Sequence, residues 1–96
     1  MASKKNLKKD INYLTQEVAE TCFLHLHLNQ DKEEKVKEID AMVHEVVDLR
    51  NDLMEKINKP DEDALKKSAK AYYKGIFQQM IDKVDDTFER LDKMDA

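Results

Sequence analysis

The fold of this chain is decided by residues 36–57, which read VKEIDAMVHEVVDLRNDLMEKI. Apolar residues recur in this stretch at steps of three and four, the spacing that places side chains on one face of an α-helix. The members of this stripe are Val36, Ile39, Val43, Val46, Leu53 and Ile57. Asn29 to Asp31 precede the stretch and Pro60 follows it, so the chain reverses direction at both ends. We therefore expect a central helix over residues 31–58.

The segments on either side show the same helical spacing. The first stripe consists of Leu7, Ile11, Leu14, Val18, Cys22 and His25, and it predicts a helix over residues 4–29. The second runs from Leu65 to Leu91 and predicts a helix over residues 61–94, which begins with a negatively charged first turn. Short turns make successive helices antiparallel neighbours. The sequence therefore predicts one all-α domain over residues 1–96, an up-down-up three-helix bundle.

Composition narrows the fold class and the partners. The 96 residues contain one Gly and one Pro, too few turn-forming residues for the connections of a β-sheet. The net charge of −4 disfavours nucleic acid, because such binding depends on Lys and Arg neutralising phosphates. No apolar run is long enough to span a bilayer, and neither the lone Cys22 nor the polar residues 1–10 point to secretion. We therefore expect a cytoplasmic protein with no nucleic-acid partner and no membrane partner.

The first helical segment also carries a resemblance. It reads Lys-Asn-Leu-Lys-Lys-Asp-Ile-Asn-Tyr-Leu over residues 5–14 and Cys-Phe-Leu-His-Leu over residues 22–26. In these stretches the chain resembles small uncharacterised all-helical proteins of Bacteroidales-type bacteria. The resemblance implies a bacterial helical protein. Since it contains no signature motif, it implies no activity and no functional residue.

Cys22 and the three histidines are the residues most typical of a transition-metal site. Cys22 and His25 share a helix face, but His27 points away from His25 because each residue turns the helix by about 100°. His44 is expected roughly 9 Å of helix rise from the level of Cys22. The chain contains no Cys-x-x-Cys and no Glu-x-x-His motif. We therefore expect a buried Cys and partly satisfied histidines, with no metal and no cofactor.

His44 is the strongest single candidate for catalysis, because a half-exposed imidazole at the edge of the central stripe would titrate near neutral pH. The chain resembles histidine phosphotransfer domains in its acidity and helical content, but those carry a Lys and a Gly shortly after the His. Here Glu45 and Asp48 follow, and their charges would repel a phosphoryl donor. No Gly-rich loop and no Ser or Thr with a placed His and acid is visible. We therefore expect no catalytic residue, with His44-based phosphotransfer or another small helical enzyme as the alternative.

Arg50 is a charged residue on the apolar side of the central helix, where it must be paired or must reach solvent. If the first two helices form a hairpin, Arg50 lies level with Asp10, and Glu17 is within two turns. The sequence therefore predicts an ion pair between Arg50 and Asp10, with an anion-binding spot inside the bundle as the alternative.

The surface predicted for binding lies at the end of the first helix. Cys22 faces inward, so Phe23 and Leu24 project away from the core, where two partner helices do not reach. The third helix is the longest, so its end is expected to extend past the first helix and enlarge the same surface. The predicted interface consists of Phe23, Leu24, His27, Leu28 and Leu91. It favours a non-catalytic protein-interaction module that forms a homodimer. The alternatives are an unidentified protein partner and a monomer covered by its own C-terminal tail.

Overall fold

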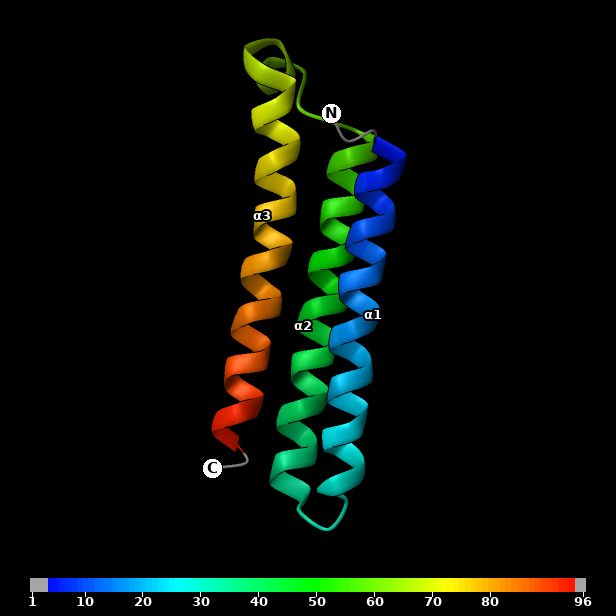
Figure 1. Ribbon diagram of the computed structural model, residues 1–96, viewed down its shortest axis with the longest axis vertical. Helices are drawn as coiled ribbons and strands as arrows, with labels where there is room; N and C mark the ends of the chain where they lie inside the picture. Colours follow the sequence, from blue (N-terminus) through cyan, green and yellow to red (C-terminus); the bar gives the residue numbers. More distant parts are fainter. Residues whose placement is uncertain (1–3, 95–96) are drawn as a thin grey trace.

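Three α-helices make up the computed structural model, which describes residues 4–94 (Figure 1). They are α1 (Lys4–Leu28), α2 (Glu33–Asn58) and α3 (Glu62–Met94). Each helix runs antiparallel to the one before it, and all three pack against one another in a rod of 51 × 19 × 18 Å. The predicted all-α, up-down-up three-helix bundle is confirmed. Within residues 4–94, no helix combines the length and the apolar character that a membrane span requires.

The apolar stripes of the three helices meet in one core. The buried apolar side chains are Leu7, Ile11, Val18 and Cys22 from α1, Ile39, Met42, Val46, Leu53 and Ile57 from α2, and Ile76, Met80, Val84 and Leu91 from α3. Val36 and Val43 belong to the predicted stripe but are only partly buried, whereas Met42 is fully buried. Met42 is buried beside the stripe because α2 contacts two helices at once, so its buried face is wider than a single line of residues.

The turn between α1 and α2 is closed by Asn29, which is buried. Its side-chain Nδ2 donates to the His25 carbonyl at 2.7 Å, and its own carbonyl accepts from the Lys32 N–H at 2.9 Å. α2 then begins at Glu33, with Lys32 as an N-cap that makes no side-chain cap bond. The helix starts two residues later than predicted because residues 29–32 satisfy their polar groups within the turn.

The start of α3 is held by two side chains. Asp61 Oδ1 accepts from the backbone N–H groups of Asp63 and Ala64 at 3.0 and 3.3 Å, which caps the first turn. The Tyr72 hydroxyl donates to the Lys56 carbonyl at 3.0 Å and accepts from the Asp61 N–H at 3.3 Å. Tyr72 therefore ties the connection between α2 and α3 to the end of α2.

A break at Ser68 interrupts α3, because the backbone there is extended (φ −169°, ψ 105°). Ser68 Oγ accepts from the Ala71 N–H at 3.1 Å, the contact that a Ser makes as the N-cap of a new helix. α3 therefore consists of a short segment over residues 62–67, which turns aside at the end of the bundle, and a long segment after Ser68 (Figure 1). The continuous helix predicted over residues 61–94 is wrong at this point, because the Ser side chain replaces the helical backbone contact.

α3 is the longest of the three helices. Because of the break at Ser68, the residues by which it exceeds the others lie at its N-terminal end. The last turn of α3 lies beside α1 and α2 and ends before the level of their shared turn (Figure 1). Leu91 is 1% exposed and belongs to the core, and Phe88 and Met94 are partly buried against it. Lys35 Nζ of α2 donates to the Met94 carbonyl at 2.8 Å. The prediction that Leu91 extends past α1 and joins an exposed surface is therefore wrong.

Candidate interaction surface

Three large apolar side chains near the C-terminal end of α1 are exposed to solvent. Phe23 and Leu24 are each 57% exposed, and Leu28 is 65% exposed. His27, which precedes Leu28, is exposed as well. We call Phe23, Leu24, His27 and Leu28 the α1 patch. Four of the five residues predicted for an interface therefore share one exposed end of a helix, and Leu91 lies apart from them in the core.

Helix geometry explains this exposure. α2 and α3 pack on the side of α1 that carries Val18 and Cys22, both of which are fully buried. Since each residue turns the helix by about 100°, Phe23 and Leu24 point roughly 100° and 200° away from Cys22. Leu26 returns toward the inner side and packs against the core. The patch is therefore a second apolar face of α1, on the side that the other two helices leave uncovered.

Polar and aromatic side chains surround the α1 patch. Tyr13, three turns before Leu24, is 62% exposed. Gln16 Nε2 donates to Glu20 Oε1 at 3.0 Å on the same outer face. His27 Nδ1 lies 2.8 Å from Gln30 Nε2. An apolar centre with a polar rim is the arrangement found at protein–protein interfaces.

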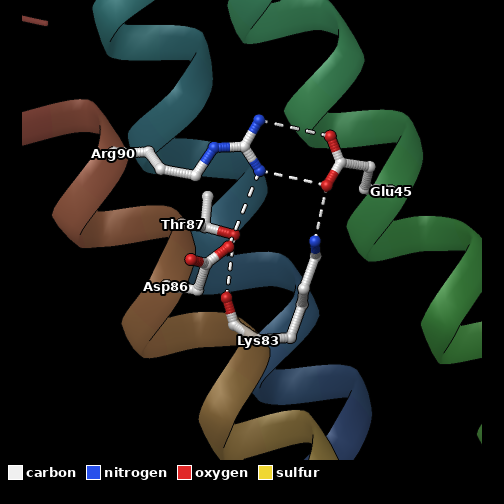
Figure 2. Close-up of polar contacts among 5 residues, drawn as sticks. All are labelled: Glu45, Lys83, Asp86, Thr87 and Arg90. Atoms are coloured by element: carbon white, nitrogen blue, oxygen red, sulfur yellow. Dashed lines mark hydrogen bonds and ion pairs between the residues drawn. The ribbon is translucent and has the colours of Figure 1, made fainter.

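The most extensive polar cluster joins α2 to α3, and the sequence did not predict it (Figure 2). Glu45 Oε1 accepts from Lys83 Nζ at 2.6 Å and from Arg90 Nη1 at 3.0 Å, and Glu45 Oε2 accepts from Arg90 Nη2 at 3.3 Å. Hydrogen bonds from Arg90 and then from Lys83 lower the pKa of Glu45 from 4.5 to about 2. Asp86 lies 3.6 Å from Arg90 and adds a second carboxylate. Both cations are therefore occupied by carboxylates, and the cluster braces α3 against α2.

The sequence of α3 contains a pattern from which this cluster could have been predicted. Lys83 and Arg90 are seven residues apart, and each directly adjoins a core residue, Val84 or Leu91. This spacing places both cations on one edge of the buried face. Sequence reasoning identified no partner for them, because it treated Glu45 only as a neighbour of His44.

Arg50 does not form the predicted ion pair. Its Nε donates to Asn12 Oδ1 at 2.9 Å, and its Nη1 donates to Asn51 Oδ1 at 2.9 Å. Asn12 and Asp10 point to opposite sides of α1, since two residues turn the helix by about 200°. Arg50 therefore contacts a neutral amide of α1, and the predicted pairing with Asp10 is wrong. The alternative of an anion-binding spot inside the bundle gains no support, because the Arg50 guanidinium already donates to two amide oxygens.

His44 lies on the exposed side of α2. Its Nδ1 is 2.8 Å from the Asp40 carbonyl oxygen and 3.6 Å from Asp40 Oδ2. The hydrogen bond to the Asp40 backbone raises the pKa of His44, and the Asp40 and Asp48 charges act in the same direction. A phosphoryl acceptor benefits from nearby cations, whereas the groups placed at His44 are carbonyl and carboxylate oxygens. Both groups that contact His44 Nδ1 are therefore oxygen atoms of Asp40.

Cys22 is fully buried, and burial raises the pKa of its thiol. A raised pKa keeps the sulfur protonated and unreactive. In the part of the chain that the structure describes, no group of three or more Cys, His, Asp and Glu side chains is arranged to hold a metal ion. Cys22 therefore acts as a small core residue in this fold.

An open hollow of about 520 Å³ lies beside the connection between α2 and α3. Its lining consists of Lys56, Lys59, Pro60, Asp61, Ala71, Tyr72, Gly75, Ile76 and Gln79. Tyr72 and Asp61 are already engaged with the backbone of the connection. No His, Cys, Ser or Thr occurs among these lining residues.

Comparisons with protein-family models, with curated proteins and with solved structures returned no match to this chain.

Proposed function

We propose that this protein is a non-catalytic interaction module that self-associates through the α1 patch. The observation that carries the proposal is the exposure of Phe23, Leu24 and Leu28, each above one half, on one face of a single helix. Monomeric proteins usually expose large apolar side chains singly, and clusters of them mark interaction sites. The polar rim formed by Glu20 and Gln30 fits the same interpretation.

A second copy of the chain is the occupant that we propose for the patch. Every copy carries the same exposed surface, and a two-fold dimer covers both surfaces at once. An unidentified protein of complementary shape is the alternative occupant. We expect the protein to act in the cytoplasm without a nucleic-acid or membrane partner.

The decisive experiment measures molecular mass in solution. Sedimentation equilibrium of the wild type, from micromolar to near-millimolar concentration, is expected to show a reversible dimer. The variant Phe23→Ser/Leu24→Ser is expected to weaken it by about a thousandfold or more, because each interface anchor contributes roughly 1–2 kcal/mol and occurs in both copies. Val47→Ser is the matched control, since Val47 is a partly exposed apolar residue of α2 outside the patch (38% exposed).

Two outcomes would contradict the proposal. A wild type that stays monomeric at the highest concentration would remove self-association as the function. A double variant that dimerises like the wild type, with unchanged helical circular dichroism, would show that the α1 patch is not the contact.

Phosphotransfer through His44, or another small helical enzyme, remains the alternative class. Incubation with a small-molecule phosphoryl donor such as phosphoramidate, followed by intact-mass measurement, separates it from the proposal. The interaction module should gain no phosphoryl group on His44, whereas a phosphotransfer protein should gain one that His44→Gln abolishes.

A further inference from the structure

Charge is segregated along the rod, although the whole chain has a net charge of only −4. Lysines gather at the end where α1 begins, α2 ends and α3 begins. They are Lys4, Lys5, Lys8, Lys9, Lys56, Lys59, Lys66, Lys67, Lys70 and Lys74. Within residues 4–94, Lys56 is the one member of this set that forms an ion pair, with Asp52 at 3.3 Å. We call this region the lysine end.

The opposite end of the rod is acidic. Its carboxylates outnumber its cations, and most of those cations are already paired within the bundle. Lys37 pairs with Glu33, Lys83 and Arg90 hold Glu45, and Lys93 pairs with Glu89. The α1 patch lies at this acidic end, because Phe23 to Leu28 adjoin the turn into α2.

The outer face of α1 repeats this polarity on one helix. Lys5 and Lys9 lie near its start, Tyr13 and Gln16 in the middle, and Glu20 shortly before the patch. All five of these residues are exposed. At about 100° per residue, Lys5, Lys9, Glu20 and Phe23 fall within one third of the helix circumference, so a single flat contact can include all of them.

We infer that the second copy packs antiparallel along the outer face of α1, so that the lysines at the start of its α1 meet the patch. This inference rests on the proposed self-association and specifies its geometry. When the two α1 helices overlap along their whole length, Lys9 lies opposite Phe23 of the partner subunit and within one helical turn of the partner's Glu20. The two-fold axis repeats both contacts. Positive ends then meet acidic ends twice in each dimer.

The chemistry of lysine suits this position. The aliphatic stem of a lysine covers apolar surface while its ammonium group stays in water. The ammonium of Lys9 would therefore approach Glu20 of the partner subunit while its stem lies on Phe23 of the partner subunit. An ammonium near an aromatic ring is itself favourable. Phe23 is thereby shielded without a second apolar surface.

Length favours full overlap of the two helices over contact at the patch alone. Residues 23–28 span roughly 8 Å of helix, whereas the 25 residues of α1 span roughly 37 Å. A stable interface buries about 800 Å² on each copy, which the patch alone does not supply. Overlap of the two acidic ends only, or parallel pairing, would also bring like charges together.

A charge-swap experiment tests the geometry. In sedimentation at low salt, Lys9→Glu and Glu20→Lys should each weaken the dimer about tenfold, since each change places like charges together twice. The double variant Lys9→Glu/Glu20→Lys should recover to within about threefold of the wild type, because the attraction is restored with reversed signs. Lys70→Glu is the matched control, since it alters net charge equally on an exposed lysine of α3 and should change affinity by less than about threefold. Raising the salt concentration should weaken the wild-type dimer.

Each other outcome is decisive. A monomeric wild type overturns the proposed function together with this geometry. A dimer that tolerates both single changes, or that tightens with salt, leaves self-association standing and overturns the antiparallel arrangement. Masses that grow beyond a dimer indicate head-to-tail assembly and overturn it as well.

Discussion

The Arg90 guanidinium holds the Glu45 carboxylate with two hydrogen bonds, Nη1 to Oε1 at 3.0 Å and Nη2 to Oε2 at 3.3 Å (Figure 2). Two parallel bonds of this kind fix orientation as well as distance. Together with Lys83, which shares Oε1, they set how far α3 can slide along α2. The cluster therefore contributes to the register of the bundle.

Glu45→Gln tests the pH dependence of this cluster. The pKa of Glu45 is lowered from 4.5 to about 2 in the folded protein, so its contribution is present above pH 4.5 and is lost as pH falls from there toward 2. Because the Glu45 side chain is 40% exposed, we expect that contribution to be about 1 kcal/mol. Urea unfolding between pH 7 and pH 2 should show a smaller acid-induced loss in Glu45→Gln than in the wild type. Glu38→Gln, an exposed change on the same helix, should behave like the wild type, and equal acid losses in all three proteins would contradict the prediction.

Val46→Asp tests the position of the core. Val46 is 2% exposed whereas Val47, the next residue, is 38% exposed. An unpaired carboxylate at Val46 should lower the free energy of unfolding by more than about 3 kcal/mol. The matched change Val47→Asp should cost less than about 1 kcal/mol. Thermal melts followed by circular dichroism compare the two, and a cooperative melt of Val46→Asp near the wild-type temperature would show that the buried face is misplaced.

Asn12→Ala and Asp10→Ala separate the observed contact of Arg50 from the predicted one. Asn12 accepts from Arg50 Nε at 2.9 Å, so its truncation should cost about 1 kcal/mol of unfolding free energy. Asp10 is exposed, and its truncation should cost less than about 0.5 kcal/mol. Urea unfolding at neutral pH measures both. A larger loss for Asp10→Ala would restore the ion pair that the hairpin arithmetic predicts.

Ser68→Ala tests the break in α3. Removing the N-cap hydroxyl should cost about 1 kcal/mol, while Ser68→Asp keeps an acceptor and should cost much less. Chemical unfolding ranks the three proteins. If Ser68→Ala were more stable and more helical than the wild type, the break would be a strained interruption of a helix that Ala repairs.

The spacing of apolar residues was sufficient to predict the three helices, because a short helix becomes stable mainly by burying an apolar stripe against its neighbours. It placed the C-terminal end of the buried face of α2 correctly, at Ile57, but it began that face at Val36, which is only partly buried, and the first fully buried residue is Ile39. It missed the break at Ser68, since a Ser inside a helical pattern has the same spacing whether it caps a new helix or faces solvent. It missed the contact of Arg50 as well, because a hairpin estimate gives the level of a residue along a helix but not the side on which it lies.

The α1 patch was also predicted in part: the residues whose exposure depends on one helix were identified, and the residue whose position depends on the packing of several helices was not. Phe23 and Leu24 were identified as exposed from their angle to Cys22, which a single helix determines, and both are exposed in the structure. Leu91 was misassigned because its position depends on where α3 begins relative to the other two helices. The Glu45 cluster depends on the relative register of α2 and α3, which the spacing of apolar residues leaves open.

More of the polar contacts described between helices join α2 to α3 than join α1 to either neighbour. Lys35, Glu45 and Lys56 tie α2 to α3 along its length, whereas Arg50 ties α2 to α1 through Asn12. α1 otherwise meets the others mainly through apolar side chains, which tolerate sliding and exchange better than directional bonds do. α1 and α2 nevertheless share the most extensive contact in the bundle, and α2 and α3 the least extensive. We therefore expect residues 4–58 to hold together as a helical hairpin, and a synthetic peptide of residues 62–94 to be the piece that complements it, with the Glu45 cluster directing its register.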